Sequence, residues 1–136
     1  MTDSQYIPAK LGYVIIYVSD VRNTVAFYRR AFGVEPRFIH ESGEYAELET
    51  GATALAFANE LSTITRDAFV PNRAGAKAAG AEVAFVVTDV PAAFAKAVDQ
   101  GATPVAEPID KPWGQTISYV RDLNGFLVEL CTAVES

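Results

Sequence analysis

The chain has 136 residues, of which 50% are apolar and 21% are charged, proportions that are ordinary for a globular protein. Its net charge of −6 disfavours nucleic acid and anionic membrane as partners, and no apolar run is long enough to span a membrane. The opening residues lack a basic start followed by an apolar stretch, so no targeting segment is expected. The single cysteine, Cys131, excludes an internal disulfide and agrees with the cytoplasmic location that we expect.

Two stretches of the chain share one pattern and indicate a duplication. The segment Tyr13–Val21 resembles Glu82–Val90, and the two align at a constant offset of 69 residues (89 − 20). The apolar positions that follow each stretch keep a helical spacing. We therefore predict one domain over residues 1–136, made of a first module at about 11–58, a connector at 59–80 and a second module at about 81–132.

Each module is predicted to contain a strand, a helix and three further strands. The first strand, at about 11–18, is apolar on both faces, so it should be covered on both sides. Asp20 and Asp89 stand where the first turn of each helix has free amide hydrogens, which predicts that both are N-caps. The other elements of the first module are a helix ending near Gly33 and strands at about 37–41, 45–49 and 53–58.

The second module repeats this plan with a strand at 82–87, a helix at about 90–100, and strands at 103–107, 115–120 and 126–131. Asn124-Gly125 between the last two strands predicts a type I′ turn, in which both residues have positive φ. On the last strand Glu129 shares a face with Leu127 and Cys131, so it is a carboxylate among apolar neighbours.

The connector at 59–80 is long for a plain loop. Two interpretations stay open. In the first interpretation the connector closes over a cleft between the modules. In the second it covers the surface without a function of its own. In the strand before it, the bare face that includes Ala56 leaves room for a ligand, whereas Leu55 and Phe57 share the bulky face.

Several motifs resemble one known family. They are VSDV and VTDV before the two helices, PWG at Pro112–Gly114 and RDLNGFLVEL at Arg121–Leu130. The chain resembles the vicinal oxygen chelate superfamily, which includes glyoxalase I, bleomycin resistance proteins and extradiol dioxygenases. The resemblance implies an α+β fold in which two βαβββ modules form a curved mixed sheet around a cleft. It also implies that a second subunit commonly completes this cleft, so we expect a homodimer.

In metal-dependent members of the family, four strands each supply one ligand. The resemblance places three of these positions at Tyr13, Glu82 and Glu129, and the fourth at Ala56 or within one residue of it. Alanine offers no donor, and the only histidine, His40, does not match a ligand position. We therefore expect no complete metal site and no cofactor. An ion held weakly by two carboxylates and a phenol is the alternative.

Both glutamates fall on positions that the family resemblance turns toward the cleft, so we expect them to meet there. Neighbouring carboxylates raise at least one pKa and can serve as an acid/base pair or as a seat for a cation. Simple solvation, or pairing with an arginine, is the alternative. The tentative catalytic residues are thus Glu82 and Glu129, and the predicted ligand-binding residues are Tyr13, Tyr17, Phe57, Trp113 and Tyr119, of which at least two should prove to be core.

The resulting hypothesis is a cytoplasmic protein that binds a small organic molecule in an aromatic, acidic cleft. The alternative is a glyoxalase-like lyase or isomerase that uses Glu82 and Glu129, with or without a weakly bound divalent metal. Cys131 is expected to be a small buried hydrophobe, because no histidine is placed to activate its thiol.

Overall fold

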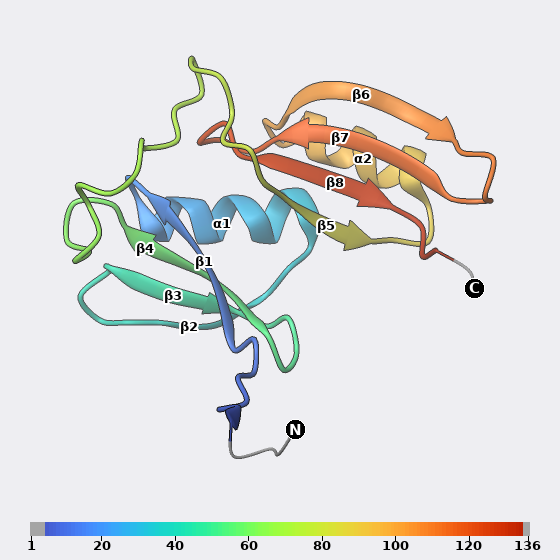
Figure 1. Ribbon diagram of the computed structural model, residues 1–136. Helices are drawn as coiled ribbons and strands as arrows, with labels where there is room; N and C mark the ends of the chain where they lie inside the picture. Colours follow the sequence, from blue (N-terminus) through green and yellow to red (C-terminus); the bar gives the residue numbers. More distant parts are fainter. Residues whose placement is uncertain (1–4, 135–136) are drawn as a thin grey trace.

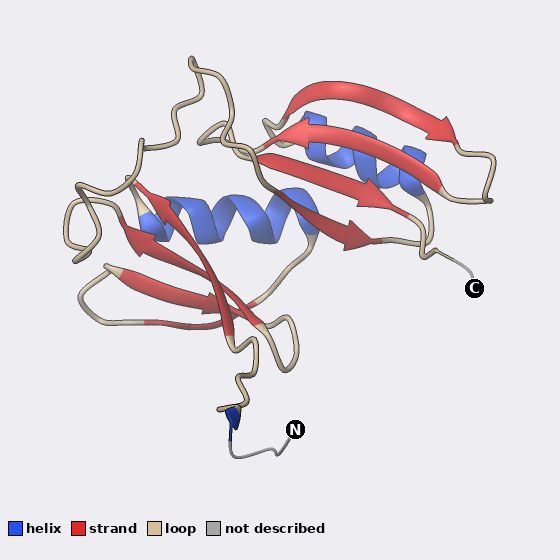
Figure 2. Ribbon diagram, viewed as in Figure 1, coloured by secondary structure: helices blue, strands red, loops and turns tan. Residues whose placement is uncertain are grey.

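The computed structural model describes residues 5–134, and within them the chain forms two βαβββ modules (Figures 1 and 2). The predicted α+β architecture is confirmed. Neither helix of the described part is long and apolar enough to cross a membrane. The elements are β1 (Tyr13–Val18), α1 (Val21–Phe32), β2 (Pro36–Ile39), β3 (Tyr45–Leu48), β4 (Ala54–Asn59), β5 (Glu82–Val86), α2 (Val90–Asp99), β6 (Thr103–Asp110), β7 (Thr116–Arg121) and β8 (Leu127–Cys131).

Both helices begin at the predicted aspartates. The Asp20 side chain accepts a hydrogen bond from the backbone N–H of Asn23 at 3.0 Å, and Asp89 accepts one from Ala92 at 3.0 Å. Each aspartate thus satisfies an amide hydrogen that has no partner within its helix. Helix α1 ends at Gly33, whose φ of 70° closes the last turn.

The modules form two separate four-stranded sheets with the same internal order, β1-β4-β3-β2 and β5-β8-β7-β6. Strand β1 runs parallel to β4 with Ile15 opposite Ala56, and β5 runs parallel to β8 with Ala84 opposite Glu129. Strands β1 and β5 are therefore edge strands, and the backbone groups on their free sides have no partner in the sheets.

One face of each sheet packs against a helix and the other face, here called the open face, does not. On β1 the helix-facing side chains Ile16 and Val18 are 5% and 1% exposed, whereas Tyr13 and Ile15 on the open face are 59% and 43% exposed. The prediction that β1 is covered on both sides is wrong for a single chain. The chain supplies only one helix per sheet, and within residues 5–134 only the connector after β4 reaches the open face of β1, where it covers Tyr17.

The two modules are joined through α1. The ring of Phe85 on β5 lies 5.6 Å from that of Phe32 and 6.2 Å from that of Tyr28 on α1. The Tyr28 hydroxyl donates a 2.6 Å hydrogen bond to the Oδ2 atom of the buried Asp122, in the turn between β7 and β8. These contacts make one continuous core of residues from both modules.

The turn between β7 and β8 corrects one prediction. No residue other than glycine has a positive φ in the described part of the chain, so Asn124 has a negative φ and the turn is not type I′. Instead the N–H of Gly125 bonds to the Asp122 carbonyl at 3.0 Å, and Gly125 alone has a positive φ of 88°. The Asp122 carboxylate also accepts hydrogen bonds from the N–H groups of Asn124 and Phe126, which stabilises this longer turn.

Candidate functional site

Two predicted residues, Glu82 and Glu129, lie on neighbouring strands of the second sheet. Both side chains belong to its open face, because Glu129 is opposite Ala84 and Glu82 precedes Ala84 by two residues on β5. Burial, followed by a hydrogen bond to the Glu129 side chain and the charge of that carboxylate, raises the pKa of Glu82. A raised pKa of this kind is typical of two carboxyl groups that share one proton.

Tyr119 completes this cluster from β7. It lies directly opposite Glu129 in the sheet register, and its ring is half-buried. Burial and the two nearby carboxylates raise the pKa of its phenol, so its hydroxyl stays protonated and able to donate. The open face of the second sheet therefore offers two carboxyl groups and one hydroxyl donor within a small area.

Cys131 also points to this face, but it is only 4% exposed. Burial and the nearby Glu129 raise the pKa of its thiol. Because the thiolate is the nucleophilic form, this environment makes the thiol unreactive. That placement agrees with the expected buried, hydrophobic role.

The open face of the first sheet carries a different cluster. The Tyr45 hydroxyl donates a 2.9 Å hydrogen bond to Glu47, and burial together with this bond raises the pKa of Tyr45 to about 12. Glu47 is 9% exposed and lies opposite Ala56 on the adjacent strand. It also contacts Arg37 at 3.5 Å.

Glu47 was missed in the sequence. Glu47 lies beside Ala56, so a carboxylate is present next to the position where the family resemblance implies a metal ligand and this sequence has alanine. The signal was available in the alternation of the predicted strand at 45–49, since Tyr45, Glu47 and Glu49 share one face.

Tyr17 lies at the far end of β1 on the same open face and contacts the connector between β4 and β5. Its ring stacks on Phe69 with centroids 4.4 Å apart and an interplanar angle of 18°. Its hydroxyl accepts a 2.7 Å hydrogen bond from Thr65, and hydrogen bonds from Thr65 and Thr63 lower the pKa of the phenol.

The remaining predicted residues are not part of either cluster. Phe57 is fully buried and packs against Tyr28 with ring centroids 4.8 Å apart, so it is a core residue that a ligand cannot reach. Trp113 is 56% exposed in the loop between β6 and β7, where the Lys111 ammonium lies 5.3 Å from its ring centroid. His40, which matched no ligand position of the family, bonds to Ser42 at 2.8 Å on the first module.

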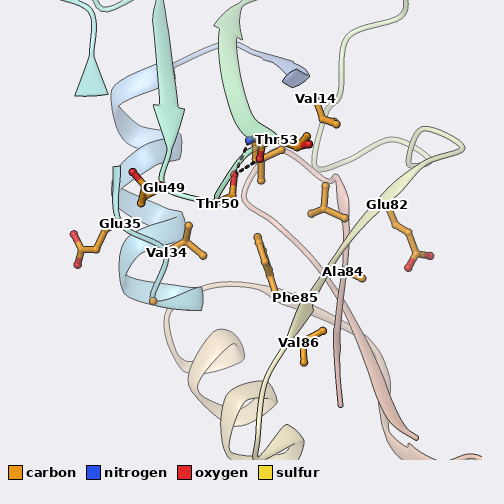
Figure 3. A pocket seen from close by; sticks show the side chains of 13 residues that line it. Val14, Val34, Glu35, Glu49, Thr50, Thr53, Glu82, Ala84, Phe85 and Val86 are labelled. Atoms are coloured by element: carbon orange, nitrogen blue, oxygen red, sulfur yellow. Dashed lines mark hydrogen bonds between the residues drawn. The ribbon is translucent and has the colours of Figure 1, made fainter. Parts of the chain in front are cut away.

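A groove of about 740 Å³ lies between the modules (Figure 3). Its floor is apolar and includes Phe85, which Figure 3 shows pointing into the groove. Glu35 and Glu49 stand on one side of this ring and Glu82 on the other. Of the predicted site residues, only Glu82 lines the groove, so the groove and the carboxylate cluster share one residue.

The donors present do not fit the metal that the family resemblance implies. Tyr13 and Ala56 lie on the first sheet, whereas Glu82 and Glu129 lie on the second. Among residues 5–134, no three His, Cys, Asp or Glu side chains are grouped so as to hold a metal ion. Two carboxylates without a third strong donor make a poor transition-metal site.

Comparison with protein families decides the relationship of this chain. A model of the Glyoxalase/Bleomycin resistance protein/Dioxygenase superfamily matches residues 10–130. The chain belongs to this superfamily. The resemblance inferred from the motifs is therefore confirmed, although a comparison with curated protein sequences found no match.

Three solved structures share the fold of this chain. A glyoxalase-related enzyme from Fulvimarina pelagi is 19% identical with a TM-score of 0.74, over 91% of this chain and 88% of that one. A glyoxalase/bleomycin resistance protein/dioxygenase family enzyme from Burkholderia phytofirmans PsJN is 21% identical with a TM-score of 0.75, over 93% and 100%. TioX from Micromonospora sp. ML1 is 25% identical with a TM-score of 0.68, over 91% and 98%.

Proposed function

We propose that the protein binds a small organic molecule with a planar, cationic part, and that two copies of the chain form the site together. The observation that carries this proposal is the cluster of Glu82, Glu129 and Tyr119 on one open sheet face. Two carboxylates attract a cation, and tyrosine rings such as Tyr13 and Tyr17 offer flat apolar surface for stacking. The cytoplasmic location, which the single cysteine favours, is part of the same proposal.

The open faces and the sheet edges support a homodimer. Tyr13, Val14 and Ile15 on β1 and Val86 on β5 are exposed large hydrophobic residues on strands with unpaired edges. Exposed apolar edge strands favour association, and a two-fold symmetric partner would cover both of them. We propose that β1 of one copy lies beside β5 of the other, which would bring the open face of the first sheet against the partner's carboxylate cluster.

A test of this function uses proflavine, a planar aromatic cation, as the probe. The purified protein should bind it with a measurable fluorescence change, and metal analysis should find no stoichiometric divalent ion. Light scattering should give twice the mass of one chain at micromolar concentration. An ion bound at one equivalent by Glu82 and Glu129 would instead contradict the metal-independent binding role.

A second candidate function is supported by the raised pKa of Glu82 beside Glu129. A protonated carboxyl group next to a carboxylate can act as proton donor and acceptor, which a lyase or isomerase requires. In this scheme Glu82 donates the proton and Glu129 accepts it. Turnover of a substrate that is lost in both Glu82→Gln and Glu129→Gln, with binding retained, would favour the enzyme over the binding protein.

A further inference from the structure

The connector between β4 and β5, residues 60–81, is fixed near both ends. At its start Glu60 is 4% exposed and accepts hydrogen bonds from both terminal nitrogens of Arg73, one of them at 2.9 Å. Further on, Arg121 of β7 donates to the Ala76 carbonyl at 2.5 Å. A side chain at Gly125 would come within 2.7 Å of the Arg73 carbonyl, so the glycine permits this close approach.

Between these points the connector has few contacts with the sheet. Leu61, Ile64 and Val70 are 71%, 102% and 89% exposed. The central part is held mainly by Tyr17, through the ring of Phe69 and the hydroxyl of Thr65. A segment with fixed ends and one aromatic contact at its centre can lift from the sheet without disturbing the core.

Phe69 contacts the face of the Tyr17 ring on which a planar ligand would stack. Tyr17 projects from the open face of β1, four residues after Tyr13. Phe69 is half-buried and nearly parallel to it, at a centroid distance of 4.4 Å. Phe69 therefore occupies the position of a stacked aromatic ring.

We infer that Phe69 is a specificity-determining residue, which covers Tyr17 until the flat ring of a ligand replaces it. This inference rests on the proposed function. A planar aromatic ligand restores the stacking that is lost when Phe69 leaves, whereas an aliphatic cation does not. Aromatic ligands thus release the centre of the connector, and aliphatic cations leave it in place.

The test compares the wild type with Phe69→Ala and Phe69→Leu, using proflavine as the planar probe and spermidine as the aliphatic cation. Proflavine should bind Phe69→Ala at least about threefold more tightly than wild type, because no internal ring competes for Tyr17. Phe69→Leu, which keeps apolar bulk but not a flat ring, should show a smaller gain. Spermidine affinity should be the same in all three proteins.

Trypsin supplies a second readout, since Arg66 lies in the exposed centre of the connector. Proflavine should accelerate cleavage after Arg66 in the wild type, and Tyr17→Ala should be cleaved quickly without any probe. Weaker or unchanged proflavine binding by Phe69→Ala, or protection of Arg66 by the probe, would overturn the inference alone. Absence of proflavine binding to every folded variant would overturn the proposed aromatic site and the inference with it.

Discussion

At the scale of single residues, the raised pKa of Glu82 makes stability depend on pH. Folding raises the pKa of this carboxyl group above its value in the unfolded chain, which is about 4.3. As the pH rises from that value through the pKa of the folded state, deprotonation of the group favours the unfolded state. Glu82→Gln removes this effect. The melting temperature of the variant should therefore exceed that of the wild type at pH 7, and the two should converge below pH 4.

The difference should be only a few degrees, because Glu82 is exposed to solvent. Glu107→Gln is the matched control, since Glu107 is an exposed carboxylate on β6 of the same module. An equal rise in both variants would attribute the effect to net charge rather than to the Glu82–Glu129 contact.

Glu129 should matter for binding more than for folding. It stands between the buried Val128 and Leu130, and the ion pairs found within residues 5–134 involve other side chains. Glu129→Gln keeps the shape, so its melting temperature should be unchanged or slightly higher. Proflavine binding, measured by titration calorimetry, should weaken by about 1–3 kcal/mol, the typical loss of a hydrogen bond to a charged group. A melting midpoint that falls steeply would instead identify Glu129 as a structural residue.

The family resemblance was sufficient to place Glu82 and Glu129 on one face of neighbouring strands, since β5 and β8 pair in the second sheet. It was not sufficient for the aromatic lining. Phe57 alternates with Ala56, so the pattern already placed it on the helix side, yet residue type alone made it a candidate. The contact between Phe69 and Tyr17 had no signal in the sequence, since it depends on how an irregular segment folds back over β1.

At the scale of elements, α1 is fixed to the β7–β8 turn by buried polar contacts. Asp122 is 2% exposed, and it accepts hydrogen bonds from the Tyr28 hydroxyl and from two backbone N–H groups of its own turn. Tyr28→Phe removes one partner from a buried carboxyl group. The free energy of unfolding, measured with urea, should fall by about 1–3 kcal/mol.

Tyr6→Phe is the control for this change, because Tyr6 is 61% exposed and its hydroxyl can bond to water. Its unfolding free energy should match that of the wild type. Equal stability of the Tyr28 variant would mean that the inter-module contact contributes little and that the shared apolar core alone joins the modules.

The order of the elements followed from local patterns, whereas β6 extends three residues beyond the predicted end at Glu107. Strand alternation, helical spacing and N-cap aspartates predicted every helix and strand in its observed order. The type of the β7–β8 turn did not follow, because the Asp122 side chain bonds to the turn's own amides and selects a longer turn than Asn-Gly favours.

At the scale of the whole molecule, the two open faces lie on separate sheets, and each sheet ends in an unpaired edge strand. The sequence pattern could not predict this separation, because the same modules can pair within a chain or between chains. In the arrangement that we propose, each site combines the first module of one copy with the second module of the other. Two sites would then form per dimer.

Subunit mixing tests this central claim most directly. The substitution Tyr13→Ala alters only the first module of a chain, and Glu129→Gln alters only the second module. Each variant alone should bind little proflavine at a concentration that saturates the wild type. After the two variants are mixed and allowed to exchange subunits, each mixed dimer contains one site with neither substitution. Proflavine capacity should therefore recover to about one quarter of the wild-type value, since half of the dimers are mixed. A mixture that binds no more proflavine than the separate variants would contradict a site shared between two copies.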